Sequence, residues 1–442
     1  MKKVLLLGAG LVTKPLVKYL LEEPEYEIVI ATRTVSKAVA LIDNHPRGEA
    51  LTLNVSDEKH LEDLIKQCDV AISLVPYAYH PTVAKFCIKH KKHCVTTSYI
   101  GEPMKALDGE AKNAGVLLLN EIGLDPGIDH MSAMRIIHDV ENQGGKIVSF
   151  RSYCGGFPAP EANNNPMLYK FSWSPKGVLM AGKNDGRFLE NGKEIYVPGP
   201  DLFTHYNIVS IEDVGDYEGY TNRDCLGYID IYGLKDAGTM FRGTLRYRTW
   251  CDTMKKIVDL GLLGEEEQDV KGKTYAEWIS TFVPGGPHGD AKKAVADHLG
   301  LSEDSLIMEK LEWMGLFSQE RLLLEKAAPI DIMTETMLKK MSYEEDERDM
   351  IILYHDFMAE YPSENRKARI TSTLVDYGIP HGDSAMSRTV SLPAAIATDL
   401  ILKGKIDLTG VHIPVMPEIY EPVLDALEKV NIICKEKTYP VE

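Results

Sequence analysis

The sequence predicts an α/β fold in which a parallel sheet covered by helices is joined to an α+β domain and a small all-helical domain. Two observations carry this prediction. Short apolar runs alternate with amphipathic stretches over the first 125 residues, as in parallel sheets that are covered on both faces. Residues 251–342 are instead rich in Glu, Lys and Leu at helical spacing, which is typical of a helical domain.

The first region supplies the parallel sheet. Its strand-like runs are Val4–Leu7, Ile28–Ala31, Ala50–Leu53, Val70–Val75, Cys94–Ser98 and Val116–Leu119. The stretches between them predict helices and include Leu11–Leu21, Leu61–Gln67 and Pro81–His90. Pro81 suits the first turn of a helix, where its missing N–H group costs no hydrogen bond.

From Gly144 onward the pattern becomes that of an α+β domain. Strands are predicted over Lys146–Cys154, Gly227–Tyr232, Thr239–Tyr247 and Arg369–Tyr377. The Gly-, Pro- and Asn-rich stretch Gly155–Pro166 predicts a loop, and Pro393–Leu402 predicts a helix. This combination of strands, loop and helix fits an α+β domain.

Composition excludes several classes of function. The 442 residues contain 49 Lys and Arg against 66 Asp and Glu, a net charge of −17, which argues against a nucleic-acid surface. No stretch approaches the ~18 apolar residues that a membrane span needs. The seven scattered cysteines form no CxxC pair, so we expect reduced thiols in the cytoplasm. No His, Asp or Glu cluster has metal-ligand spacing, and no metal is expected.

A glycine turn follows the first strand directly. Gly8-Ala9-Gly10-Leu11-Val12-Thr13 connects that strand to a helix. Such a turn lets backbone N–H groups meet a pyrophosphate at a helix N-terminus, as in Rossmann domains. Thr13 stands where the usual fingerprint has its third glycine, so tight packing of the turn alone is the alternative.

The end of the second strand distinguishes the two nicotinamide cofactors. An NAD site usually carries an acid there, whereas this strand runs into Thr32-Arg33-Thr34. A guanidinium flanked by hydroxyls suits a 2′-phosphate, so NADP(H) is favoured over NAD(H). The alternative is a solvated surface arginine. The next strand ends, at Asn54-Val55 and at Val75, should line the same crevice, although Asn54 could equally serve turn formation.

Several long segments carry a resemblance to a known family. They are Thr96–Ile100, Asn120–His130, Ser152–Glu161, Tyr169–Ser174, Arg242–Tyr247, Asp346–Met350 and Ser372–Gly378. With them the chain resembles the saccharopine reductases, also called saccharopine dehydrogenases (NADP, L-glutamate-forming), from Val4 to about Pro440. It also resembles the C-terminal half of the bifunctional aminoadipic semialdehyde synthases.

The resemblance implies a reaction and its ligands. L-glutamate and 2-aminoadipate 6-semialdehyde condense to an imine, which NADPH reduces to saccharopine in a reversible step. The substrate positions implied are Ser98, Tyr99, Asp125, Arg223, Thr244, Leu245 and Arg246. The cofactor positions implied, together with those of the glycine turn and strand ends, are Gly8, Gly10, Leu11, Val12, Thr13, Thr32, Arg33, Thr34, Asn54, Val55, Val75, Thr97 and Trp173.

Imine chemistry needs proton transfers, for which Asp125 is the first candidate. Its place at a strand-to-helix junction allows a partly desolvated carboxylate, while the following Pro126 makes a helix cap the alternative. Tyr99 and Cys154 are secondary catalytic candidates. His80 and His130 are assigned to capping or packing.

The predicted organisation has three parts. A Rossmann NADP-binding domain spans 1–124 and 383–442, an α+β substrate and dimerisation domain spans 125–250 and 349–382, and a helical domain spans 251–348. The resemblance also implies a homodimer. The alternatives are a carboxynorspermidine-type dehydrogenase and a catalytically idle NADP-binding protein. The first would need acids for a diamine, and Arg223 and Arg246 favour a substrate with several carboxylates.

Overall fold

The computed structural model describes residues 1–286 and 289–441. The chain divides into two compact units. The first unit comprises Met1–Ile147 and Met358–Glu442, and the second comprises Val148–Phe357. The three-part division from the sequence stays a prediction.

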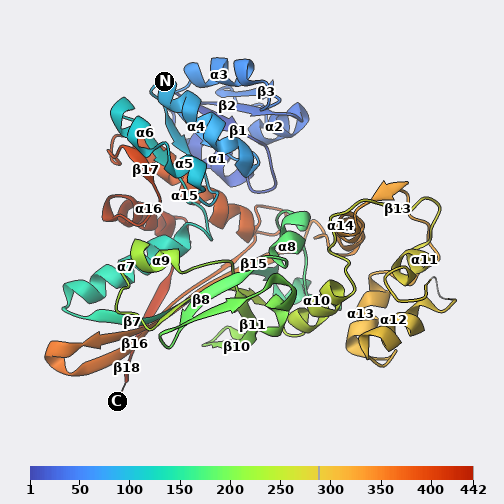
Figure 1. The fold of residues 1–442 in the computed structure, drawn as a ribbon. Coiled ribbons are helices and arrows are strands. Elements are labelled where there is room, and N and C mark those ends of the chain that lie inside the picture. The colour runs from blue at the N-terminus through green and yellow to red at the C-terminus, as the bar shows by residue number, and fades with distance from the viewer. Residues whose placement is uncertain (287–288, 442) are drawn as a thin grey trace. The chain divides into compact units, whose positions relative to one another are not determined.

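The first unit opens with alternating strands and helices (Figure 1). Its strands are β1 (Lys2–Leu7), β2 (Tyr26–Thr32), β3 (Gly48–Thr52), β4 (Val70–Ser73), β5 (His93–Val95) and β6 (Leu117–Leu119), followed late in the chain by β16 (Arg366–Tyr377), β17 (Gly410–His412) and β18 (Lys435–Val441). Its helices are α1 (Lys14–Glu22), α2 (Val35–Ile42), α3 (Glu58–Lys66), α4 (His80–Lys89), α5 (Glu102–Lys105), α6 (Asp108–Ala114), α7 (Ile128–Asn142), α15 (Ala385–Leu402) and α16 (Pro417–Lys429).

Seven of these strands form a sheet in the order β17-β6-β5-β4-β1-β2-β3. All neighbours run parallel, with Leu5 opposite both Val29 of β2 and Ala71 of β4. The α/β fold with a Rossmann-type sheet is therefore confirmed. The order reverses at β1, whose neighbours are β2 and β4, so the carboxyl end of β1 faces the crevice where such sheets bind ligands.

Side-chain alternation along the strands builds a core on each face of this sheet. On one face, Leu5, Leu7 and Val29 pack in a buried cluster with Leu61 of α3 and Val83 of α4. The intervening residues point to the other face, where α1 packs against α15. Because both faces are covered, the inner strands contain continuous buried apolar runs such as Val4–Leu7 and Ile28–Ala31, which is why the sequence pattern located them.

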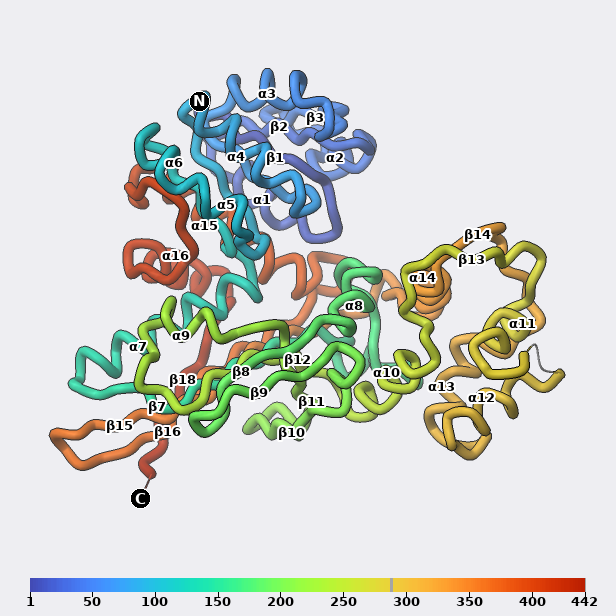
Figure 2. Tube along the Cα trace, viewed as in Figure 1, coloured from blue at the N-terminus to red at the C-terminus, as the bar shows by residue number. Residues whose placement is uncertain are grey.

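The second unit combines a sheet with a group of helices (Figure 2). Its strands are β7 (Lys146–Pro158, of which all but the first two residues belong to this unit), β8 (Gly186–Glu190), β9 (Lys193–Val197), β10 (Tyr206–Ile211), β11 (Gly215–Thr221), β12 (Thr239–Arg246), β13 (Gln268–Asp269), β14 (Lys326–Ala327) and most of β15 (Asp349–Tyr361). Its helices are α8 (Pro175–Ala181), α9 (Gly227–Ile231), α10 (Trp250–Asp259), α11 (Tyr275–Ser280), α12 (Ala291–Leu299), α13 (Leu306–Trp313) and α14 (Pro329–Lys340).

Strand β12 lies inside the mixed sheet of this unit. It pairs in parallel with β7 and antiparallel with β11, which in turn pairs with β10. The hairpin β8–β9 joins it through β8 (Figure 2). The predicted helical character of residues 251–342 is confirmed by α10 to α14, with only the short pair β13–β14 interrupting it.

Two local predictions were wrong. Gly227–Tyr232, predicted as a strand, is the short helix α9, because a five-residue segment is too short for periodicity to separate the two states. The predicted loop Gly155–Pro166 begins later, since β7 continues to Pro158. A Cβ atom at Gly155 would lie 2.7 Å from the carbonyl oxygen of Leu245. Glycine here permits a close strand approach and does not mark a turn.

Candidate dinucleotide and substrate site

The glycine turn after β1 is stabilised by a hydrogen bond to one of its own side chains. Gly8 has φ = 110°, and a Cβ there would lie 2.8 Å from the carbonyl oxygen of Leu74. The buried Thr13 hydroxyl accepts a hydrogen bond from the Gly10 N–H group at 2.9 Å. Thr13 therefore stabilises the turn at the position where a third glycine usually stands. A Cβ at Gly10 would meet no atom within 4 Å, so this backbone is open to a ligand.

Helix α1 begins at Lys14, immediately after this turn. The positive end of its dipole and its unpaired N–H groups favour an anion such as a pyrophosphate. Leu11 at the tip of the turn is 70% exposed and Val12 is partly exposed. The open Gly10 backbone, together with this helix end, fits the pyrophosphate of a dinucleotide.

The strand ends beside β1 bring the other predicted cofactor residues to one edge of the sheet. Thr32 ends β2, and the exposed residues Arg33 and Thr34 follow it. Within the described residues, the Arg33 guanidinium makes no hydrogen bond or ion pair, so its donors can meet a phosphate. Asn54 follows β3 and accepts a hydrogen bond from the Ser56 N–H group at 3.2 Å, which is a turn contact. The remaining predicted positions of this unit are the partly buried Val55, Val75 and Thr97.

The segment after β5 meets the junction before α7. The Tyr99 hydroxyl donates a hydrogen bond to Asp125 Oδ1 at 2.7 Å, and both side chains are partly buried. Helix α7 has Gly127 as its N-cap, without a side-chain hydrogen bond to the cap position. The N-cap position is thus Gly127, and Asp125 Oδ1 faces a phenol, a group that can share or pass a proton.

A buried histidine connects β4 to the same segment. His80 Nδ1 lies 2.8 Å from Ser73 Oγ, and His80 Nε2 lies 2.9 Å from Ser98 Oγ. Burial lowers the pKa of His80 to about 4. The imidazole is therefore neutral near pH 7, with one nitrogen donating and the other accepting. From the sequence, His80 was assigned to capping or packing. The structure shows that it orients the Ser98 hydroxyl.

His80 also predicts a pH dependence of stability. Its pKa is lower in the folded state than the ordinary value of 6.5, so the unfolded chain binds more protons between pH 6.5 and 4. Its contribution is complete above pH 6.5 and is lost as the pH falls toward 4, by up to about 3 kcal/mol. The free energy of unfolding of His80→Gln, measured by denaturant titration at pH 7.0 and 4.5, should fall less with acid than that of the wild type. Parallel losses in both proteins would contradict this assignment.

In the second unit, Arg246 ends β12 as a buried cation. Its side chain is 5% exposed, and its guanidinium carbon lies 5.0 Å from the ring centre of Tyr169 and 5.5 Å from that of Trp250. Nη1 donates to the Leu245 carbonyl at 2.7 Å, while the buried Nε has no partner among the described residues. A desolvated guanidinium with unused donors is suited to a carboxylate ligand.

The surroundings of Arg246 are fixed by a buried acid. Glu218 of β11 lies opposite Arg246 in the sheet register. Its carboxylate accepts hydrogen bonds from the N–H groups of Thr249 at 2.5 Å and Cys251 at 2.8 Å, at the start of α10. These bonds hold Trp250, the first residue of α10, beside the Arg246 guanidinium.

The other predicted residues of the second unit differ in how far they are buried. Cys154 is buried in β7 opposite Thr244, next to the buried Leu245 of β12. Arg223 is exposed, with φ = 60°. Trp173 packs partly buried against the helical core. The roles of these residues remain predictions.

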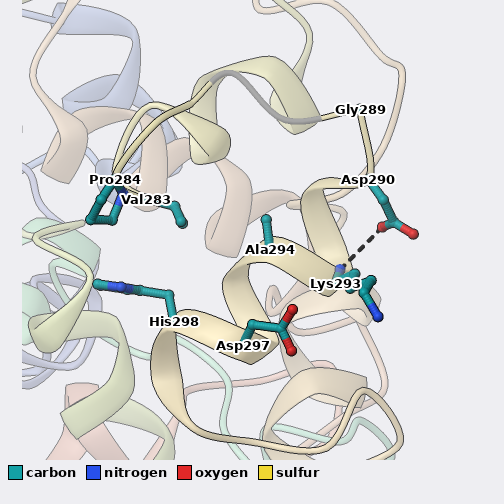
Figure 3. A pocket seen from close by; sticks show the side chains of 8 residues that line it. All are labelled: Val283, Pro284, Gly289, Asp290, Lys293, Ala294, Asp297 and His298. Atoms are coloured by element: carbon teal, nitrogen blue, oxygen red, sulfur yellow. Dashed lines mark hydrogen bonds between the residues drawn. The ribbon is translucent and has the colours of Figure 1, made fainter.

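Other features of the described residues give no competing site. Figure 3 shows a hollow beside α12, around which Asp290, Lys293, Asp297 and His298 lie. Its acidic and basic groups are mixed, and its lining residues differ from the predicted ones. No group of three or more His, Cys, Asp or Glu residues in the described ranges could hold a metal ion. Nor is any described helix long and apolar enough to cross a membrane.

The parallel sheet, its glycine turn and the cationic end of β2 define a dinucleotide-binding protein of the Rossmann class. Two family models match the chain. The saccharopine dehydrogenase NADP binding domain matches residues 4–119, and the saccharopine dehydrogenase C-terminal domain matches residues 123–433. The chain belongs to the saccharopine dehydrogenase family.

Individual relatives agree with this membership. The saccharopine dehydrogenase [NADP(+), L-glutamate-forming] of Schizosaccharomyces pombe is 40% identical over 99% of both chains. The apo saccharopine dehydrogenase (L-Glu forming) structure from Saccharomyces cerevisiae superposes with a TM-score of 0.91 at 37% identity, covering 99% of this chain and 100% of that one. The mitochondrial alpha-aminoadipic semialdehyde synthase of Mus musculus is 36% identical over 98% of this chain, which covers 47% of that protein. The resemblance found in the sequence is confirmed.

Proposed function

We propose that the protein is a saccharopine reductase in lysine metabolism. It joins L-glutamate and L-2-aminoadipate 6-semialdehyde through an imine and reduces that imine with NADPH to L-saccharopine, in a reversible reaction. The geometric observation that carries the proposal is the buried Arg246 guanidinium with donors to spare in a chain of net charge −17. Saccharopine has three carboxylates, and an acidic protein must bind them with dedicated local cations.

The cofactor is NADP(H). Gly8, Gly10 and Thr13 shape the turn for its pyrophosphate, and Arg33, which follows β2, is proposed to bind the 2′-phosphate of the adenosine ribose. Bound NADPH supplies the hydride that adds to the imine carbon. The further cofactor contacts proposed are Leu11, Val12, Thr32, Thr34, Asn54, Val55, Val75, Thr97 and Trp173.

The proton transfers are assigned to the Tyr99–Asp125 couple. Addition of the glutamate amine to the aldehyde gives a carbinolamine, whose oxygen must take a proton before it leaves as water. Asp125 gives that proton and is reprotonated from solvent, and after hydride addition it gives a second proton to the amine nitrogen, which completes the saccharopine ammonium. The Tyr99 hydroxyl, 2.7 Å away, stabilises the Asp125 carboxylate by donating to it. Cys154 is a secondary candidate for acid/base work.

Seven residues are proposed to contact the substrate. Ser98, Tyr99 and Asp125 belong to the first unit. Arg223 and Arg246 are proposed to bind substrate carboxylates. Thr244 and Leu245 are proposed to line the substrate pocket. We also propose a homodimer in the cytoplasm. The cytoplasmic assignment is supported by the seven buried cysteines, which are thiols and not disulfides.

A thermal-shift assay separates this function from its rivals. A ligand that binds only the folded state raises the melting temperature. We expect shifts with NADP and with saccharopine. A shift with NADP alone indicates an idle NADP-binding protein, and a shift with carboxynorspermidine but not saccharopine indicates the polyamine enzyme. Either outcome contradicts the proposal.

Arg33→Asp should change the cofactor preference. The substitution removes a cation from the 2′-phosphate and offers an acceptor to a ribose hydroxyl. The kcat/KM for NADP should fall by about 10- to 100-fold, as expected for losing a charged hydrogen bond of about 1.5–3 kcal/mol. The value for NAD should fall less or rise. An unchanged NADP/NAD ratio of kcat/KM in steady-state assays would show that Arg33 does not bind the phosphate.

A further inference from the structure

A buried carboxylate–imidazole pair lies next to the chain segment that carries Tyr99. Glu121 is 1% exposed and His130 is fully buried. His130 Nε2 lies 2.7 Å from Glu121 Oε2. A carboxylate oxygen only accepts, so Nε2 is the donor. Neither residue is among the proposed substrate or cofactor contacts.

Glu121 contacts both chain neighbours of Tyr99. Its N–H group donates to the Ser98 carbonyl at 3.2 Å. Its Oε1 accepts from the Ile100 N–H group at 2.9 Å. One residue therefore fixes the backbone on each side of Tyr99, and the rotation of this segment determines where the phenol points.

His130 lies next to the turn that carries Asp125. It lies in the first turn of α7, and its Nδ1 is 3.8 Å from Asp129 Oδ2. Asp129 Oδ1 in turn accepts from the Gly127 N–H group at 2.6 Å, and the Asp129 N–H group donates to the Leu124 carbonyl at 3.0 Å. These bonds close the turn that carries Asp125. The Glu121–His130 contact thus joins the segment that holds Tyr99 to the turn that holds Asp125.

The cost of this arrangement points to a role beyond stability. A buried hydrogen-bonded pair of polar side chains usually stabilises a fold little more than apolar side chains of the same shape. Glu121 also has φ = 55°, a conformation that is unfavourable for a residue with a side chain. Such strained backbone is concentrated at functional sites, where neighbouring structure enforces it.

We propose that Glu121 and His130 are positioning residues that set the Tyr99 hydroxyl against Asp125 for proton transfer. They act through the bonds to Ser98 and Ile100 and touch no reacting atom. The proposal rests on the function proposed above for Asp125.

A double-mutant cycle on the full-length enzyme tests it. Glu121→Ala removes the Ile100 contact and should lower kcat by about 10- to 100-fold, because small misplacements of reacting groups cost that much. The KM for NADP should stay within about twofold, since neither Glu121 nor His130 is among the proposed cofactor contacts. In a Tyr99→Phe background the same change should cost less than about threefold, because the hydroxyl being positioned is already absent.

Two further variants separate positioning from folding. Glu121→Gln keeps an acceptor for the Ile100 N–H group and should retain kcat to within about threefold. Glu62→Ala is the matched control: it removes another Glu–His contact, the 2.7 Å pair of Glu62 with His90, and should change neither kcat nor KM. If Glu121→Ala does not fold, His130→Gln takes its place in the cycle, with the same expected lack of additivity.

The outcomes are distinguishable. If Glu121→Ala lowers kcat by the same factor in the wild-type and the Tyr99→Phe backgrounds, the Glu121–His130 pair only stabilises the fold. That result overturns the inference. An equal rise in the KM for NADP also overturns it. If Asp125→Asn alone leaves turnover unchanged, the proposed role of Asp125 fails first, whatever the cycle shows.

Discussion

Asp125→Asn lowers turnover of saccharopine by about 10²–10⁴-fold, the range expected when a positioned acid/base is removed. Asparagine has nearly the same size and can still accept the hydrogen bond that Tyr99 donates to Asp125 Oδ1. The free energy of unfolding should change by less than about 1 kcal/mol, because the side-chain volume and the hydrogen bond from Tyr99 are both kept. Steady-state kinetics across pH, with denaturant unfolding of both proteins, measure the two quantities.

The pH profile makes the result specific. If Asp125 transfers protons, the variant should lose one limb of the profile, because each limb reports an essential titrating group. Near-normal turnover with a lowered melting temperature would contradict the assignment and leave Asp125 a structural residue. Tyr99 and Cys154 would then be the next acid/base candidates to substitute.

Arg246→Met raises the KM for saccharopine by about 30-fold or more, because losing one partner of a buried charged pair costs about 2–5 kcal/mol. Methionine keeps an unbranched apolar side chain between the rings of Tyr169 and Trp250. The KM for NADP should change little.

The melting temperature distinguishes a substrate-binding role of Arg246 from a structural role. Replacing a buried charge by an apolar side chain is often neutral or stabilising, by up to about 4 kcal/mol. The melting temperature of the free enzyme should therefore stay constant or rise. A lowered melting temperature with equal damage to saccharopine and NADP binding would show that Arg246 is a structural residue.

Much of the fold could be predicted because local pattern and tertiary structure agree in the first unit. Its parallel strands are buried on both faces, so their apolar runs are continuous and their ends fall near the predicted ones. The cofactor turn was visible because its chemistry is local in sequence. Helix α9 and the extension of β7 were missed, since the first is too short for periodicity and the second depends on a contact with Leu245.

The candidate site was predictable residue by residue but not as a network. Tyr99 and Asp125 were singled out separately, and the structure adds the 2.7 Å bond between them. Glu121 gave no signal of its own, because its importance lies in a left-handed backbone and in bonds to residues more than twenty positions away. From the sequence, His80 and His130 were assigned to capping or packing. Only their hydrogen-bond partners, Ser98 and Glu121, indicate a role near the site.

The most direct test of the proposed function is NADP-dependent oxidation of saccharopine by the purified protein. NADPH formation is followed by absorbance while L-glutamate and 2-aminoadipate semialdehyde are quantified. We expect one NADPH and one L-glutamate for each saccharopine consumed, reversal when NADPH and both products are supplied, and a much slower reaction with NAD. No NADPH formation from saccharopine under conditions where the protein is folded and binds NADP would contradict the account.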